Sequence, residues 1–94
     1  MPIPFRITPM NISKNEQRVL HALAQGGRIL YDRGPNGRVM DVQCYTREGY
    51  VLENCTLDVF RKLRRKRFIE SLNSSPYRIS DRGRRNVRAQ PDNR

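Results

Sequence analysis

Residues 56–80 of this chain read TLDVFRKLRRKRFIESLNSSPYRIS, and the first half of that stretch has the pattern of an amphipathic basic helix. Thr56 suits the N-cap of a helix, and the carboxylate of Asp58 complements the helix dipole in the first turn. At 100° per residue the apolar side chains fall on one side: Leu57, Val59, Phe60 and Leu63. Four cations fall on the opposite side: Arg61, Lys62, Arg65 and Lys66. The stretch therefore predicts a helix with one packed face and one exposed, cationic face.

The second half of the same stretch predicts a β-hairpin. Residues 68–72 (FIESL) and 77–80 (YRIS) are apolar runs on either side of the turn-forming residues 73–76, NSSP. Beyond them, residues 80–90 are rich in arginine and only weakly apolar, and we expect a C-terminal helix there.

Residues 13–27 predict another helix ahead of the basic one. Ser13 and Glu16 have the spacing of a capping box, in which each side chain bonds the backbone amide of the other residue. Apolar residues then follow at helical spacing: Val19, Leu20, Leu23 and Ala24. The Gly26-Gly27 pair ends this helix, because glycine readily adopts the left-handed conformation that is common at helix ends.

Residues 28–45 predict a first hairpin. Residues 28–32 and 38–45 carry β-branched and aromatic side chains on either side of the turn 34–37, GPNG, whose Asn-Gly step tolerates positive φ. Residues 50–52 (YVL) are too few for periodicity to separate a third strand from a short helix, and we favour a strand.

The order helix, hairpin, basic helix, wing hairpin and C-terminal helix predicts an α+β fold, and within it a small winged-helix-like domain. In such domains the helix before the last hairpin is presented to the major groove of DNA. We expect the domain to span residues 10–90. Residues 1–9 contain three prolines and are expected to form a flexible N-terminal extension, and residues 91–94 a C-terminal tail.

The charge of the chain is concentrated towards its C-terminal end. Its 94 residues hold 19 Lys and Arg against 9 Asp and Glu, for a net charge of +10. Residues 1–60 carry a net charge of +1, and residues 61–94 carry +9. Clustered like charges steer association with oppositely charged partners, so we expect DNA or the acidic surface of a protein as the partner.

The candidate binding residues are the cations of the basic helix and of the region after it. Six of the seven positions in 61–67 are cationic, and arginine prevails further on, where its planar fork suits phosphate or carboxylate. The full set is Arg61, Lys62, Arg64, Arg65, Lys66, Arg67, Arg78, Arg82, Arg84 and Arg85. The alternative is a solvated helix face followed by a disordered basic tail. Tyr77 could stack on a base, but a half-buried place in the core is the favoured interpretation.

Catalytic and metal-binding chemistry finds little support in the sequence. Cys44 and Cys55 lack the CxxC spacing of a redox or zinc site and are expected to be reduced and buried. His21, the single histidine, is expected to be a core or helix-surface residue, and no phosphate-binding or dinucleotide-binding glycine motif is present. We therefore expect no enzyme activity, no cofactor and no metal. No apolar run is long enough for a membrane span and the first residues do not form a secretory signal, so we expect a cytoplasmic protein without a membrane partner.

Ten short segments, in their order and spacing, carry a resemblance to a known family. They are 10–13 (MNIS), 16–18 (EQR), 20–21 (LH), 23–24 (LA), 26–29 (GGRI), 44–45 (CY), 47–49 (REG), 55–57 (CTL), 76–79 (PYRI) and 86–90 (NVRAQ). From residue 10 to residue 94 the chain resembles the YjhX family of small bacterial proteins. The usual start of that family near Met10 agrees with the expected N-terminal extension.

The resemblance implies a toxin-like role. The namesake of the family is described as an inhibitor of DNA topoisomerase I that is paired with an acetyltransferase-like antitoxin. The partners that the resemblance implies are therefore DNA topoisomerase I and such an antitoxin. No site residue comes with it, so the candidate residues rest on charge and helix geometry alone. A winged-helix DNA-binding regulator of transcription is the alternative, and an RNA- or ribosome-associated factor is a third hypothesis.

Overall fold

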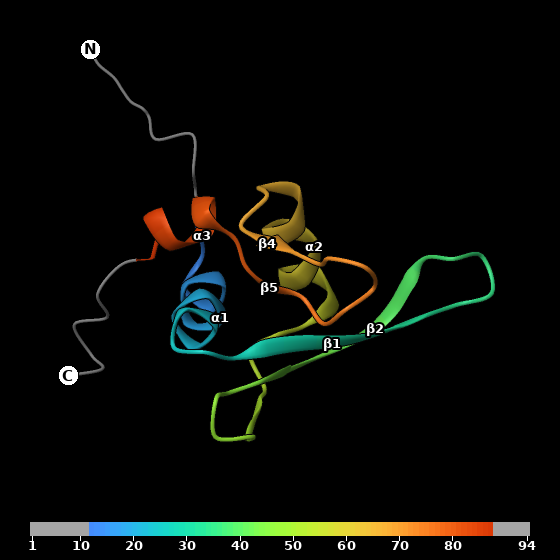
Figure 1. Ribbon diagram of the computed structural model, residues 1–94, viewed down its shortest axis with the longest axis horizontal. Helices are drawn as coiled ribbons and strands as arrows, with labels where there is room; N and C mark the ends of the chain where they lie inside the picture. Colours follow the sequence, from blue (N-terminus) through green and yellow to red (C-terminus); the bar gives the residue numbers. More distant parts are fainter. Residues whose placement is uncertain (1–11, 88–94) are drawn as a thin grey trace, which may run out of the picture.

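The order of helices and strands follows the prediction. The computed structural model describes residues 12–87. Their elements are, in chain order, α1 (Lys14–Ala24), β1 (Arg28–Arg33), β2 (Val39–Tyr45), β3 (Val51–Leu52), α2 (Leu57–Arg65), β4 (Ile69–Glu70), β5 (Arg78–Ile79) and α3 (Asp81–Arg85) (Figure 1).

Two antiparallel sheets are joined by one pair of backbone hydrogen bonds. β1, β2 and β3 form the larger sheet in that order, and β4 pairs with β5. The N–H of Ile29 in β1 donates to the carbonyl of Tyr77, and the N–H of Tyr77 donates back to the carbonyl of Ile29, each at 2.9 Å. β1 therefore lies against the segment that leads into β5, while the far end of the β1–β2 hairpin extends beyond the helices (Figure 1).

Each helix begins at a side chain that caps it. Ser13 and Glu16 form both bonds of the predicted capping box. The hydroxyl of Thr56 accepts from the N–H of Val59 at 3.2 Å, as expected for the N-cap of α2. The hydroxyl of Ser80 accepts from the N–H of Gly83 and donates to the carbonyl of Arg67, so it also ties α3 to the turn after α2.

The core lies between the helices and the inner sides of the two sheets. Its largest fully buried side chains are Phe60, Phe68, Leu20, Leu23, Ile29, Leu63, Glu16, Val19 and Cys44. The ring of Tyr77 belongs to the same core and lies edge-on to Tyr31 and Phe60, with ring centroids 5.2 and 5.0 Å away. Tyr77 is only 8% exposed, which confirms the core interpretation and leaves no open ring face for stacking on a base.

The α+β prediction is confirmed, and its details are sharpened. Residues 51–52 form a short strand, as favoured. The C-terminal helix was expected over residues 80–90, but α3 ends at Arg85 because Asn86 leaves the helical conformation, with φ −110° and ψ 3°. The winged-helix arrangement of these elements stays a prediction. The expected extension 1–9 and tail 91–94 lie outside the described residues.

Gly83→Ala should lower the free energy of unfolding by about 1–3 kcal/mol, the usual cost of overpacking a core. A Cβ at this buried position would collide with the carbonyl oxygen of Phe68 and with the side chain of Ile79. Urea unfolding monitored by circular dichroism measures the effect. Arg82→Ala on the exposed side of α3 is the control and should change the stability by less than about 0.5 kcal/mol. An unchanged stability of Gly83→Ala would show that α3 can move away from β4 without cost.

Candidate functional site

The packed face of α2 is confirmed, and its cationic face is exposed except at Lys66. Val59, Phe60 and Leu63 are buried against the core. The cations that are exposed are Arg61, Lys62, Arg64, Arg65 and Arg67. The side chain of Lys66 is only 20% exposed, so the prediction that it lies on the free face is wrong.

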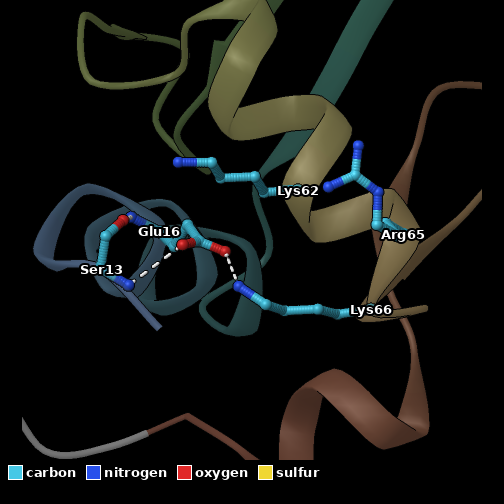
Figure 2. A pocket seen from close by; sticks show the side chains of 5 residues that line it. All are labelled: Ser13, Glu16, Lys62, Arg65 and Lys66. Atoms are coloured by element: carbon cyan, nitrogen blue, oxygen red, sulfur yellow. Dashed lines mark hydrogen bonds and ion pairs between the residues drawn. The ribbon is translucent and has the colours of Figure 1, made fainter. Parts of the chain in front are cut away.

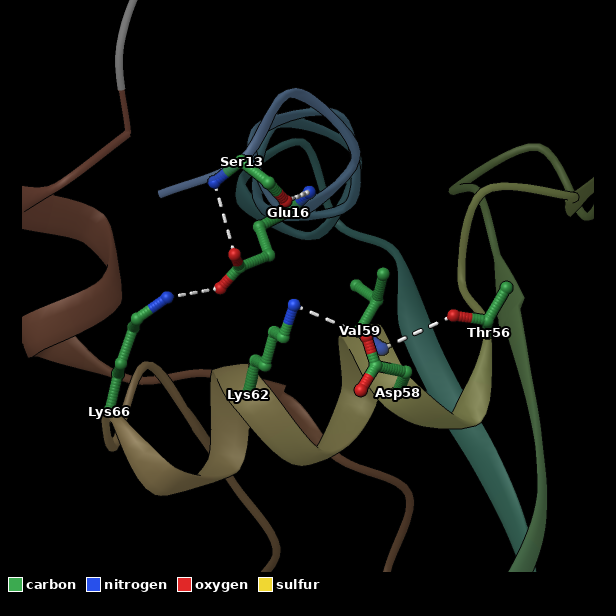
Figure 3. A network of polar contacts seen from close by, with 7 residues as sticks. All are labelled: Ser13, Glu16, Thr56, Asp58, Val59, Lys62 and Lys66. Carbon is green, nitrogen blue, oxygen red and sulfur yellow. Dashed lines mark hydrogen bonds and ion pairs between the residues drawn. The ribbon is translucent and has the colours of Figure 1, made fainter. Parts of the chain in front are cut away.

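Lys66 turns towards α1 and pairs with a buried carboxylate (Figure 2). Its Nζ lies 2.5 Å from Oε2 of Glu16, a side chain that is 1% exposed. The other carboxylate oxygen of Glu16 accepts from the N–H of Ser13 at 3.0 Å (Figure 3). A buried carboxylate needs a counter-charge, and Lys66 supplies it. The helical pattern of α2 alone cannot show that α1 presents a buried carboxylate at this place.

This ion pair changes the acidity of Glu16. Burial by itself would raise the pKa of the Glu16 carboxyl, but the bonds from Lys66 and Ser13 outweigh it and hold the pKa below its usual value. Lys62, one turn earlier on α2, makes a looser and exposed pair with Asp58 at 3.2 Å (Figure 3). Lys66, the C-cap of α2, therefore has a structural role, whereas Lys62 in α2 lies at the surface.

Seven of the ten predicted cations line three cavities. The first, of about 350 Å³, lies between α1 and α2 and is lined by Ser13, Glu16, Lys62, Arg65 and Lys66 (Figure 2). The second, of about 320 Å³, is lined by Arg38, Val39, Phe60, Arg61 and Arg64. The third, of about 240 Å³, is lined by Glu70, Leu72, Ser75, Pro76, Arg78, Ile79 and Arg84. Arg67, Arg82 and Arg85 are exposed and line none of the three.

Arg38 is the cation that the sequence interpretation missed. It lies between the turn of the first hairpin and β2, far from the basic stretch along the chain. Packing of α2 against β2 brings it beside Arg61 and Arg64. In the sequence Arg38 directly follows the turn residues 34–37, which is an ordinary position in a hairpin. Only the packing of α2 against β2 shows that Arg38 lies beside the cations of α2.

The two cysteines are both buried and free, as expected for Cys44 and Cys55. A hydrogen bond between the two thiols, together with burial, raises the pKa of Cys55 well above its ordinary value, which keeps that sulfur protonated and unreactive. Within residues 12–87 no cluster of three potential metal ligands is present. No helix in that range is long and apolar enough to cross a membrane.

Comparison with known proteins places the chain in a family. Residues 10–94 match the YjhX toxin family, whose description reads "Putative toxin of bacterial toxin-antitoxin pair". The chain belongs to this family. Similar proteins are UPF0386 proteins of Ruegeria sp. (strain TM1040), Beijerinckia indica and Brucella anthropi, which are 75%, 69% and 61% identical over 85 residues. Each match covers 90% of this chain and 100% of the relative. No solved structure gives a significant match.

In this member of the YjhX toxin family, Lys66→Met should lower the free energy of unfolding by about 2 kcal/mol or more. The substitution keeps most of the side-chain volume but leaves the buried Glu16 carboxylate without its cation. Lys62→Met removes the same charge from the exposed pair with Asp58 and should cost less than about 1 kcal/mol. Urea unfolding of the two variants side by side makes the comparison. Equal losses would contradict the structural role given to Lys66.

The stability of the wild-type chain should fall as the pH drops through the lowered pKa of Glu16. A carboxyl whose pKa is lower in the folded than in the unfolded state stabilises the fold above the unfolded value, and that contribution disappears as the folded form becomes protonated. Urea unfolding between about pH 6 and pH 3 tests this for wild type and Glu16→Gln. The stability difference between the two chains should shrink towards the acidic end. A constant difference would mean that the charge of Glu16 is not what stabilises the α1–α2 contact.

Proposed function

We propose that this member of the YjhX toxin family is a non-catalytic binding protein that inhibits DNA topoisomerase I through the cationic face of α2. The observation that carries the proposal is the exposure of five cations on α2 and immediately after it, of which only Lys62 has an ion-pair partner within residues 12–87. The family description supports a toxin, and the resemblance to the namesake of the family supports topoisomerase I as the target. Burial of both cysteines supports a role without covalent catalysis.

Charge gives this face two ways to act on an enzyme that works on DNA. Exposed cations concentrated on one helix raise the local potential and accelerate encounter with an acidic surface. The same cations can cover the phosphates of the DNA substrate. As a toxin of a toxin–antitoxin pair the chain has an antitoxin partner, and we propose an acetyltransferase-like protein in that role and the cytoplasm as the place where the pair acts.

A winged-helix DNA-binding regulator of transcription is the second candidate. A basic helix that precedes a hairpin, as α2 precedes β4 and β5, favours it, because an exposed helix fits the major groove. Such a regulator must prefer one duplex over others at physiological salt, since phosphate contacts alone carry no sequence information. A competition experiment between a palindromic duplex and random DNA separates it from an inhibitor that ignores sequence.

Lys62→Gln/Arg65→Gln should raise the concentration needed for half-inhibition of topoisomerase I at least tenfold, because charge-assisted contacts contribute about 1.5–3 kcal/mol each. Relaxation of supercoiled plasmid by topoisomerase I, with rising amounts of the chain, measures this. Arg18→Gln/Arg47→Gln removes two exposed charges from α1 and from the turn between β2 and β3, and serves as the charge-matched control. It should inhibit like wild type.

Two results would contradict the proposal. Full topoisomerase activity at an excess of the wild-type chain would remove the enzyme as a target. Equal loss of inhibition in both double variants would mean that net charge, and not the face of α2, determines the effect.

A further inference from the structure

The cavity between α2 and the start of β2 is lined by cations and by no acidic residue. Three arginines line it, together with the two apolar residues Val39 and Phe60. Its volume of about 320 Å³ is roughly ten times the space that one water molecule occupies in the liquid. The cavity is therefore large enough for a polyatomic anion and part of what the anion is attached to.

Two different elements supply the arginines. Arg61 and Arg64 are three residues apart on α2 and so lie on the same side of the helix. The guanidinium of Arg64 lies 5.3 Å from the ring centroid of Phe60, which limits the positions open to it. Arg38 comes from the opposite wall, where its backbone closes the hairpin turn through bonds with Gly34 and Asn36. Guanidinium groups thus approach the cavity from two sides.

The charge of this cavity is uncompensated, unlike that of the other two. Every ionisable residue that lines it is an arginine, whereas Glu16 lines the first cavity and Glu70 lines the third. Within residues 12–87, Arg38, Arg61 and Arg64 make no ion pair with a carboxylate. Three like charges gathered over an apolar floor repel one another, and an anion in the cavity relieves that repulsion.

We propose that this cavity binds a phosphate of a nucleic-acid backbone. The two free oxygens of a backbone phosphate project from a tetrahedral phosphorus and can accept from guanidinium groups on different sides, whereas the two oxygens of a carboxylate accept mainly in one plane. A nucleic acid also continues past the cavity with further phosphates, and Arg65, exposed on the next turn after Arg61, can take one of them. Phe60 is fully buried and Tyr77 nearly so, so the aromatic rings here are not platforms for bases. The site binds backbone and does not read sequence.

Phosphate binding in this cavity goes beyond the inhibition of topoisomerase I. It names the ligand of the cavity between α2 and β2, and this binding does not require the enzyme. It also adds Arg38, a residue of the first hairpin, to a binding site that otherwise consists of residues of α2. The fold sets the relative position of the hairpin and the helix before the nucleic acid binds. Because the arginines of both elements are already in place, the entropic cost of binding the phosphate is lower.

Fluorescence anisotropy with a labelled duplex oligonucleotide of arbitrary sequence tests the site without topoisomerase. Binding is measured at several salt concentrations between about 50 and 200 mM, where the slope of log affinity against log salt counts the neutralised phosphates. Arg38→Gln and Arg64→Gln should each weaken binding several-fold, and the double variant Arg38→Gln/Arg64→Gln should reduce the magnitude of the slope by about 0.9, the value for one phosphate. Arg47→Gln removes one exposed charge away from the cavity and should leave the slope unchanged. Thermal unfolding of each variant confirms that the exposed substitutions leave the fold intact.

A conservative variant separates geometry from charge. Arg38→Lys keeps the positive charge but loses the planar fork, so the salt slope should stay near that of wild type while the affinity falls. A slope for the double variant Arg38→Gln/Arg64→Gln that equals the wild-type slope would overturn the proposal, and so would a wild-type chain that does not bind the duplex at about 50 mM salt. Arg38→Gln that keeps duplex binding but loses inhibition of topoisomerase I would show that the cavity holds an acidic protein side chain instead. In that outcome this inference fails and the proposed function stands.

Discussion

The pairing of Ile29 with Tyr77 is the contact on which the rest of this fold depends. Its two hydrogen bonds join the three-stranded sheet to the segment that leads into β5. The ring of Tyr77 then packs edge-on against Tyr31 from the larger sheet and Phe60 from α2. Once Phe60 is turned inwards, helical periodicity determines which residues of α2 point outwards. The direction of the cationic face therefore follows from a contact made between the two sheets.

The second constraint is the ion pair between α1 and α2. A carboxylate that takes part in a capping box usually remains near solvent, but Glu16 is buried where α2 crosses over it. Lys66 supplies the counter-charge that stabilises the buried carboxylate, and its ammonium group therefore does not belong to the exposed cationic face. One cation of the basic stretch 61–67 thus holds the helices together, while the other five stay exposed at the surface.

The division of the remaining cations has consequences for function. Lys62 and Arg65 lie beside α1, near Glu16, whereas Arg61 and Arg64 face the first hairpin and its Arg38. Under the proposed inhibition of DNA topoisomerase I, these adjoining groups of cations would contact a protein surface and a nucleic-acid backbone at the same time. Arg78 and Arg84 line another cavity together with Glu70 and Leu72, so the net charge of its lining is smaller.

The local elements of this protein were accessible from its sequence. Capping residues such as Ser13 and Thr56 mark the helix starts, the Asn-Gly step marks the hairpin turn, and periodicity separates the buried from the exposed side of α2. Family membership was accessible in the same way, because short segments in a defined order are a property of the chain. These signals act over a few residues, and the physical preferences behind them are local.

Only the tertiary structure decided what happens where distant segments meet. It turned Lys66 inwards towards Glu16, placed Tyr77 between two aromatic rings and brought Arg38 to Arg61 and Arg64. The fate of an ionisable side chain depends on the charge and the solvent around it, and for these residues both are set by elements far away along the chain. The sequence of α2 gives the number and spacing of its charges. The packing of α1 and β2 against α2 determines which of those charges stay exposed.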